Sequence, residues 1–338
     1  MRALVTGSAG VVGFHLCKHL LEADWEVIGV DNFVNSSAID QYWAMAEHRN
    51  FTHFSIDLND AKQLEVLPTD VDVVFHLAAI NGTQNFYDKA LDVARSCTIP
   101  TLNLIDKFTG APNLSRFVFT GTSESYACSV ELGLAAIPTP EDVLLSIDNP
   151  KNLRWSYAAG KTMSELFVLS AAKQCGMPTT ILRYHNTYGP RMGDKHFIPD
   201  FVGRALRGQF ELYGYDQTRS FIYVEDAVDL TVRAALAPNL LGDILNVGSE
   251  EELEIQKAAR IILEELGMGE QEIECHPAPP GSVSRRCPDV SKARRLFPDW
   301  SPRDFRAGVK QLVHDDLFLR QKLEGSSLEA GLELECQH

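Results

Sequence analysis

The feature that most constrains this chain is the regular alternation of strand-like and helix-like segments in its first half. Short apolar runs such as ALVTG (3–7), EVIGVD (26–31) and VDVVFHLAA (71–79) are separated by stretches in which apolar residues recur at helical spacing. Further strands are expected at 50–58, 116–123 and 178–186, and helices at 11–25, 92–108 and 156–174. Strands joined by helices of this length form a parallel sheet covered on both faces. The sequence therefore predicts a doubly wound α/β fold, which binds its ligands beyond the carboxyl ends of the strands.

The pattern changes after about residue 186. Segments rich in Gly, Pro and Arg, at 188–201, 214–221 and 276–289, alternate with helices expected at 199–207, 224–237, 253–266 and 302–322. A chain of 338 residues is also longer than one core usually supports. We therefore expect a larger domain at 1–185, to which residues 220–260 return, and a smaller C-terminal α/β domain at 186–322 that binds the substrate. Residues 323–338 are expected to form a flexible tail.

A glycine-rich segment, VTGSAGVVG, follows the first expected strand and opens the first helix. Gly7 permits a tight turn, Gly10 lets the backbone approach a diphosphate, and Gly13 lets helix and strand pack closely. The helix N-terminus then offers N–H donors and positive potential to the diphosphate. Asp31 ends the second strand, near the spacing at which a carboxylate meets an adenosine ribose, and it would repel a 2′-phosphate. The pattern predicts a Rossmann-type dinucleotide site that prefers NAD to NADP.

Charge and cysteine usage argue against several classes of partner. Asp and Glu total 46 against 31 Lys and Arg, and the resulting net charge of −15 disfavours binding to nucleic acid or to anionic membranes. No apolar run reaches the roughly 18 residues that a membrane span needs, and we expect no signal peptide because the chain enters a strand at once. Seven scattered cysteines indicate reduced thiols in the cytoplasm. No metal site is expected, since His15 and His19 have no third ligand.

The spacing of the glycines, TGxxGxxG, resembles that of extended short-chain dehydrogenases/reductases that act on nucleotide sugars, the NAD-dependent nucleotide-sugar epimerase/dehydratase family. Other segments resemble motifs of this family in the same order: DL at 57–58, HLAA at 76–79, SYAAGK at 156–161, RYHNTYGP at 183–190, RSFIYVEDAV at 219–228 and RRCPD at 285–289. The resemblance runs from about residue 3 to residue 317. It implies bound NAD, a nucleotide-diphosphate sugar as substrate, and a homodimer built on helices around 90–108 and 157–175, where Leu166, Phe167 and Leu169 are apolar.

The resemblance also implies which residues hold NAD. They lie in the glycine-rich segment, at the end of the second strand, in the DL and HLAA segments, and around the YxxxK pair: Gly7, Gly10, Val11, Val12, Gly13, Asp31, Asn32, Asp57, Leu58, Leu77, Ala78, Ala79, Tyr157, Lys161 and Tyr184. Cys97 and Pro100 stand where relatives often have Asn and Gly, so the wall of the cofactor site departs from the family pattern there.

Tyr157 and Lys161 are four residues apart on an expected helix, so both side chains project from one face. A phenol has an ordinary pKa of about 10 and is a poor base at neutral pH. A neighbouring ammonium group and a positively charged nicotinamide ring favour the phenolate and lower that pKa. Tyr157 is therefore the predicted base, which removes a sugar hydroxyl proton while hydride leaves the same carbon for NAD.

The segment TGTSES (120–125) supplies the other predicted catalytic residues, Thr122, Ser123 and Glu124. By resemblance, Thr122 falls at the hydroxyl that contacts the reacting sugar oxygen, and Ser123 lies beside it. The presence of Glu124 does not decide which reaction follows oxidation at C4. Family 4-epimerases often have a small or hydroxyl residue there, whereas a glutamate can manage a proton next to a ketone, as dehydratases and decarboxylases require. Glu124 can equally cap the backbone or pair with an arginine.

The expected substrate contacts are spread over several loops. Asn186 resembles the family residue that contacts the diphosphate, and Arg219 and Arg286 suit its charge. Asp289 is expected either to fix Arg286 or to bind the nucleotide ribose. The loop at 80–90 differs from the usual epimerase segment and is expected to shape sugar specificity, while His185 replaces a common aromatic residue and could reach the sugar. The predicted substrate residues are Asn81, Gly82, Thr83, Asn186, Arg191, Arg219, Arg286 and Asp289.

These features predict an enzyme that oxidises a nucleotide-linked sugar at C4 with NAD, forms a 4-keto-hexose and reduces it again. Epimerisation is the preferred outcome. A 4,6-dehydratase or a UDP-glucuronate decarboxylase-like reaction through Glu124 is the alternative. A protein that only senses NAD or a nucleotide is disfavoured, because such proteins usually lose the tyrosine or the lysine and this chain has both.

Overall fold

The computed structural model describes residues 1–34, 39–193, 196–278 and 283–315, without the side chains of residues 83, 84, 314 and 315. Its centre is a seven-stranded sheet in the order β10-β6-β5-β4-β1-β2-β3, and all of its neighbouring strands run parallel. The strands are β1 (Arg2–Thr6), β2 (Glu26–Val30), β3 (Phe51–Phe54), β4 (Val73–His76), β5 (Arg116–Thr122), β6 (Thr179–Tyr184) and β10 (Asp243–Val247). The inner strands are almost entirely buried, which explains why they read as continuous apolar runs.

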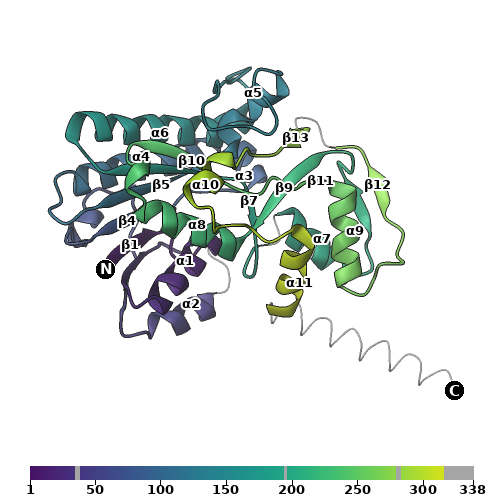
Figure 1. Ribbon diagram of the computed structural model, residues 1–338, viewed down its shortest axis with the longest axis horizontal. Coiled ribbons are helices and arrows are strands. Elements are labelled where there is room, and N and C mark those ends of the chain that lie inside the picture. The colour runs from purple at the N-terminus through teal and green to yellow at the C-terminus, as the bar shows by residue number, and fades with distance from the viewer. Residues whose placement is uncertain (35–38, 194–195, 279–282, 316–338) are drawn as a thin grey trace.

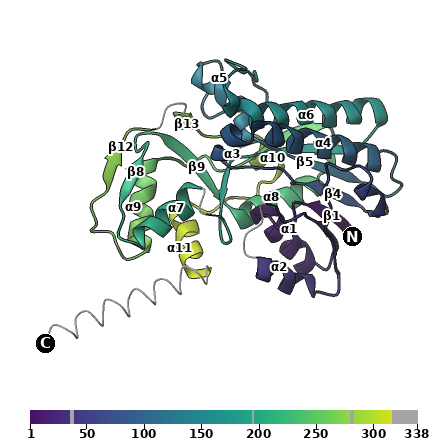
Figure 2. The ribbon, with the colours of Figure 1, turned by 180° about the vertical axis from the view of Figure 1, so that it is seen from behind.

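Helices cover both faces of this sheet (Figures 1 and 2). The helices α1 (Val11–Glu22) and α8 (Val224–Leu236) pack together on one face, and α4 (Ala90–Phe108) and α6 (Ser156–Cys175) pack together on the other. Each layer has its own apolar core. Leu16 and Leu20 of α1 belong to the first core, and Leu104 of α4 and Val168 of α6 belong to the second. The helix α4 contains Pro100, as the sequence predicts.

The later part of the chain builds a smaller unit beside the sheet, seen on the right of Figure 1. It contains two further sheets, one of β7 (Asn186–Tyr188), β9 (Thr218–Tyr223), β11 (Glu252–Glu254) and β13 (Arg285–Arg286), the other of β8 (Glu211–Tyr213) and β12 (Glu274–His276). The helices α7 (Phe197–Ala205), α9 (Ile255–Glu265) and α11 (Phe305–Asp315) pack around them.

Short elements complete the described part of the chain. They are the helices α2 (Ile39–Ala46), α3 (Thr83–Asp88), α5 (Ala127–Glu131) and α10 (Ser291–Leu296), with 3₁₀ turns η1 (Gln63–Val66), η2 (Ser123–Tyr126), η3 (Leu153–Trp155) and η4 (Pro238–Leu240).

The predicted Rossmann-type doubly wound fold is confirmed. Several element bounds are shorter than expected: β4 ends at His76 and not at residue 79, because the following residues leave the sheet and turn toward the glycine-rich segment. Within the segment 220–260, β10 pairs with β6, and α8 packs on the same sheet. The division into 1–185 and 186–322 stays a proposal, and the predicted tail at 323–338 lies outside the described residues.

Candidate active site

Most of the predicted site residues follow strands of the parallel sheet. Gly7 follows β1, Asp31 follows β2, Leu77 follows β4, and Thr122 ends β5. Because carboxyl ends of parallel strands meet at one edge, these residues gather along a single line.

The glycine-rich turn has the shape that a dinucleotide diphosphate requires. Gly7 has a φ of +69°, and a Cβ there would come within 2.9 Å of the Ala78 nitrogen. A Cβ on Gly13 would lie 2.0 Å from the Gly7 carbonyl oxygen, so helix α1 can approach the turn only with glycine at this position. The helix begins at Val11, and no side chain of the described residues caps it at Gly10. Its first N–H groups can therefore bind an anion.

Asp31 lies where an adenosine ribose is expected, and its carboxylate also shapes the turn. Oδ2 accepts a hydrogen bond from Ala9 N at 3.0 Å, and Oδ1 accepts one from Phe33 N at 2.7 Å. The Thr6 hydroxyl accepts from the nitrogens of Leu77 and Ala78, which draws the segment after β4 toward the turn.

The remaining predicted cofactor residues lie around this line. Val11 and Val12 begin α1 and are half-buried, and Leu58 is buried. Asn32 accepts a hydrogen bond from Val34 N, and Asp57 accepts one from Asn59 N. Ala79 packs against the buried cluster that contains Phe86, and the Tyr184 hydroxyl hydrogen-bonds that of Thr231. None of these contacts conflicts with a cofactor role, and the roles stay predictions.

Tyr157, Lys161 and Thr122 meet at the start of α6. The Lys161 ammonium donates to the Thr120 carbonyl at 2.9 Å and lies 4.8 Å from the centre of the Phe119 ring. Burial lowers the pKa of Lys161. Thr122 hydrogen-bonds the Tyr157 hydroxyl and also accepts from Glu124 N at 3.2 Å.

The expected lowering of the Tyr157 pKa depends on the positive charge of bound NAD and stays a prediction; the protein groups alone act in the other direction. Burial raises the pKa of Tyr157, Cys97 and Glu124 add to that shift, and the hydrogen bond from Thr122 only partly opposes it. The physical reason is that an apolar surrounding disfavours the phenolate, while Lys161 is directed at the Thr120 carbonyl. Cys97 contributes because it packs against Gly160, at the seam between α4 and α6.

Glu124 is held between two arginines, and we call these three residues the Glu124 cluster. Its Oε1 lies 2.7 Å from Nη2 of Arg286, and its Oε2 lies 3.1 Å from Nη1 of Arg154. All three side chains are at most 15% exposed. Burial opposes the charged form of Glu124, but Arg286 and Arg154 outweigh it and lower the pKa of the carboxyl group. Glu124 is therefore ionised at neutral pH. Ser123 is buried beside it at the start of η2.

Arg219 and Asn186 adjoin the Glu124 cluster. Strands β9 and β13 pair so that Arg219 stands opposite Arg286. Burial, together with Arg286, lowers the pKa of Arg219 to about 9. Its guanidinium donates to the carbonyls of Thr218 at 2.8 Å and Val283 at 2.6 Å. Asn186 Oδ1 lies 3.5 Å from Arg286 Nη1.

Two predicted substrate residues lie elsewhere. Arg191 lies on the cofactor side: its guanidinium carbon is 3.6 Å from the centre of the Phe14 ring, and Nη2 is 3.5 Å from the Ala9 carbonyl. Asp289 precedes α10 and accepts from Ser291 N at 2.8 Å, and it does not fix Arg286, which pairs with Glu124 instead.

Asn81, Gly82 and Thr83 lead into α3, where Gly82 has a φ of +107°; the side chain of Thr83 lies outside the described residues. His185 hydrogen-bonds the buried Tyr126 hydroxyl and is itself buried. It therefore supports the turn that carries Glu124.

Sequence reasoning missed Arg154 and Phe86. Arg154 lies in η3, just before α6, and its contact with Glu124 joins residues 30 positions apart, so no local spacing pointed to it. Phe86 belongs to the loop at 80–90, and its ring stacks on that of Tyr157 with centroids 5.0 Å apart and planes inclined by 9°. The loop thus reaches the predicted base directly.

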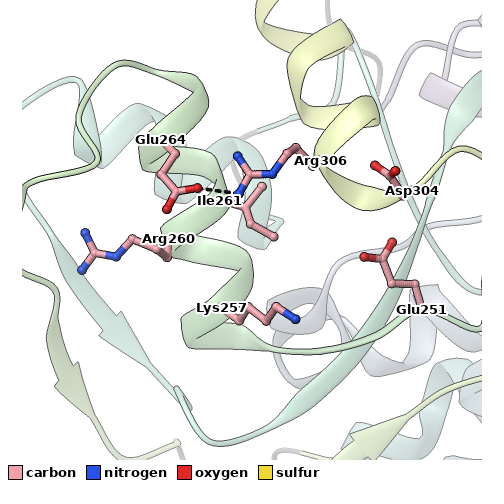
Figure 3. Close-up of a pocket in the computed structure, with 7 residues that line it drawn as sticks. All are labelled: Glu251, Lys257, Arg260, Ile261, Glu264, Asp304 and Arg306. Atoms are coloured by element: carbon pink, nitrogen blue, oxygen red, sulfur yellow. Dashed lines mark hydrogen bonds and ion pairs between the residues drawn. The ribbon is translucent and has the colours of Figure 1, made fainter.

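A separate hollow of about 430 Å³ lies between α9 and α11 (Figure 3). Its lining is mostly charged, and Arg306 pairs there with Glu264. None of the predicted site residues lines it, so we do not place the chemistry there. In the described part of the chain, no helix is long and apolar enough to cross a membrane.

Comparisons with known proteins agree with this geometry. Residues 3–248 match the NAD dependent epimerase/dehydratase family. The chain is 33% identical over 323 residues to the UDP-N-acetyl-alpha-D-glucosaminuronate decarboxylase of Bacillus cytotoxicus, covering 92% of this chain and 96% of the relative. It is 32% identical over 331 residues to UDP-glucuronic acid decarboxylase 1 of Xenopus tropicalis, covering 96% and 73%.

Among solved structures, the UDP-glucuronic acid 4-epimerase of Bacillus cereus, in complex with UDP-glucuronic acid and NAD, matches with a TM-score of 0.80 and 25% identity, covering 95% of this chain and 99% of that one. The fold and the glycine-rich turn thus define an NAD-binding Rossmann protein. The chain belongs to the NAD-dependent epimerase/dehydratase family, whose curated members similar to it are enzymes.

Proposed function

We propose that this protein is an NAD-dependent decarboxylase of a UDP-linked hexuronate. The observation that carries the proposal is Glu124, which is held ionised by Arg154 and Arg286 beside the buried Tyr157 and Thr122. The names of the relatives that match nearly the whole chain support the same reaction.

The first half of the reaction uses the residues at the start of α6. NAD supplies the hydride acceptor at the start of the cycle, a positively charged ring, and the hydride donor at its end. Tyr157 takes the proton of the C4 hydroxyl, and Thr122 orients the same oxygen while holding the Tyr157 hydroxyl. The Tyr157 phenolate, which burial disfavours, would be favoured by the positive charges of the bound nicotinamide ring and of Lys161 together.

Glu124 then distinguishes among the reactions open to a 4-keto sugar. A dehydratase must remove the C5 proton, and a carboxylate whose pKa two arginines lower is a weak base for that step. A 4-keto-hexuronate needs no base, because the C5–C6 bond breaks, carbon dioxide leaves, and the electron pair moves into the C4 ketone. C5 then takes a proton from solvent. Glu124 orients the two guanidinium groups of Arg154 and Arg286, and the net positive charge of this cluster can bind the C6 carboxylate beside the C4 ketone.

The rest of the pocket suits an anionic substrate. Arg219 and Arg286 lie side by side on paired strands, and Asn186 adjoins Arg286. Two guanidinium groups can bind a diphosphate through charge-assisted hydrogen bonds, which a protein of net charge −15 needs locally. The smaller unit that carries them is therefore the proposed substrate-binding domain.

Epimerisation at C4, the outcome preferred from the sequence, is the second candidate. Tyr157, Lys161 and Thr122 suffice for it, and the solved structure of the UDP-glucuronic acid 4-epimerase favours it. An epimerase that takes a hexuronate must keep the C5–C6 bond of the keto intermediate, so the two reactions differ in whether carbon dioxide is lost.

The experiment is incubation of the purified protein with UDP-glucuronate, its N-acetyl-amino analogue, UDP-glucose and dTDP-glucose, with products followed by chromatography and mass spectrometry. Loss of carbon dioxide from an acidic sugar supports the proposal. An isomer of unchanged mass makes the protein an epimerase, and loss of water makes it a dehydratase.

We further propose a homodimer in the cytoplasm. Four apolar side chains on the outer side of α4 and α6 are 40 to 63% exposed: Leu91, Leu102, Met163 and Leu166. Leu91 and Leu102 are eleven residues apart, three helical turns, and so share a face. Of the other apolar residues expected there, Phe167 and Leu169 are half-buried and pack against the second core. Every cysteine among the described residues is a free thiol, which suits a reducing compartment.

A further inference from the structure

A chain of buried hydrogen bonds connects the glycine-rich turn to the third strand of the sheet. The Ser8 hydroxyl lies 2.8 Å from the Tyr42 hydroxyl, and that hydroxyl lies 2.7 Å from Nδ1 of His53. Ser8 belongs to the turn itself, Tyr42 to α2, and His53 to β3. Ser8 and Tyr42 have no exposed surface. We call this connection the Ser8–Tyr42–His53 bridge.

The residues around this bridge pack closely against its two hydroxyl groups. A Cβ on Gly29 of β2 would lie 2.8 Å from the Tyr42 hydroxyl and 2.9 Å from the Ser8 hydroxyl. Gly29 therefore makes the space in which the two hydroxyls meet. On the other side, Tyr42 makes edge contacts with the rings of Phe33 and Trp43, 5.5 and 5.6 Å away. These rings cover Tyr42, which has no exposed surface, while His53 at the far end of the bridge is half-buried.

The bridge adds a side-chain contact to the backbone contacts that hold the turn. Gly7 N donates to the Val30 carbonyl at 2.8 Å, and Ala9 N donates to Asp31 at 3.0 Å. Ser8 lies between these two residues, and its side chain is the part of the turn that reaches α2. The backbone of the turn is thus fixed through β2, and its side chain through α2 and β3.

We propose that Tyr42 is a positioning residue for NAD: its hydroxyl holds Ser8 and so keeps the glycine-rich turn in the shape that binds the cofactor diphosphate. Tyr42 itself need not touch NAD. Without the hydroxyl, the Ser8 oxygen and His53 Nδ1 both lose a buried partner. Buried polar groups that lose a partner are costly, so the turn would move to find another one.

The test compares two buried tyrosines in the same protein. Tyr42→Phe removes only the bridging hydroxyl. Tyr188→Phe is the matched control, because that hydroxyl is also buried and donates to the Phe305 carbonyl at 3.1 Å, away from the turn. The dissociation constant of NAD is measured by calorimetric titration of protein freed of cofactor. We expect about tenfold weaker binding in Tyr42→Phe and no change in Tyr188→Phe, while thermal denaturation shows a loss of stability in both.

Ser8→Ala supplies a second, independent measurement. It cuts the same bridge at its other end, so it should weaken NAD binding similarly, and the double variant should be no weaker than Tyr42→Phe alone. Equal NAD affinity in Tyr42→Phe and the wild type overturns the proposal, as does an additive double variant. If Tyr42→Phe does not fold, unchanged affinity in Ser8→Ala overturns it. The titration needs no sugar substrate, so its outcome is separate from the proposed decarboxylation.

Discussion

At the scale of residues, the charged side chains of the candidate site are positioned by ion pairs and hydrogen bonds with their neighbours. Glu124 connects Arg154, which precedes α6, with Arg286 from β13, far along the chain. Lys161 is held by a backbone carbonyl, and Tyr157 by Thr122 and the ring of Phe86. The pKa of Glu124 therefore depends on two arginines that single substitutions can remove.

Arg154 is expected to keep Glu124 ionised. Since this arginine and Arg286 lower the pKa of Glu124, Arg154→Met should raise it, and the acidic limb of the pH–rate profile should move to higher pH. We expect kcat at neutral pH to fall about tenfold or more. Arg154→Lys, the matched control, keeps the charge and should move the limb less. A profile that is the same in all three proteins would contradict this role.

Arg191 is expected to bind the cofactor diphosphate. Its guanidinium lies over the Phe14 ring and within 3.5 Å of the Ala9 carbonyl, beside the glycine-rich turn. Arg191→Gln should raise the dissociation constant of NAD about tenfold or more and leave the KM for the sugar nucleotide unchanged at saturating NAD. A raised KM for the sugar nucleotide with normal NAD binding would contradict this role. It would show that Arg191 contacts the substrate, as the sequence predicts.

At the scale of elements, the parts that could be predicted are those with a local signal. The sequence predicts strands β1 and β5 from their apolar runs and α6 from its length. In these elements the residue type at each position follows from whether that position is buried. The short strands β7, β9 and β13 gave no such signal, since their pairing joins residues 35 positions apart for β7 with β9 and 67 positions apart for β13 with β9. Arg286 could be suspected from a motif, but its pairing with Glu124 depends on those strands.

The exposed face of α4 and α6 is expected to form the dimer. A double substitution of Leu91 and Leu166 by Glu places like charges on an apolar contact and should give a monomer in analytical ultracentrifugation. Leu132→Glu together with Leu144→Glu, at similarly exposed leucines outside these two helices, is the control and should stay dimeric. A wild-type protein that sediments as a monomer would refute the dimer itself.

At the scale of the whole molecule, buried neutral histidines link stability to pH. Burial lowers the pKa of His76 and His185 well below the ordinary value, while the unfolded chain takes up a proton near pH 6.5. The unfolded state therefore binds more protons as the pH falls, and folding weakens. From about pH 7.5 to about pH 5.5, the free energy of unfolding should drop by about 1.4 kcal/mol for each histidine.

Urea denaturation at these two values of pH measures the drop. His185→Phe, which puts an aromatic side chain in the same place, should remove one of the two contributions. Glu124 contributes in the opposite range: its lowered pKa stabilises the fold above about pH 4.5, and this stabilisation is lost only at lower pH. Equal or greater stability at the lower pH would contradict the prediction.

The central claim, that Glu124 directs a 4-keto-hexuronate to lose its carboxylate, is tested most directly with UDP-glucuronate labelled with carbon-13 at C6. The wild-type protein and Glu124→Gln are followed by carbon NMR. We predict that the wild type releases the label as bicarbonate in equal amount to a UDP-pentose, and that Glu124→Gln slows this release at least about a hundredfold while it still binds NAD. Label that stays in a C4 epimer of the substrate, at the same rate in both proteins, would contradict the account.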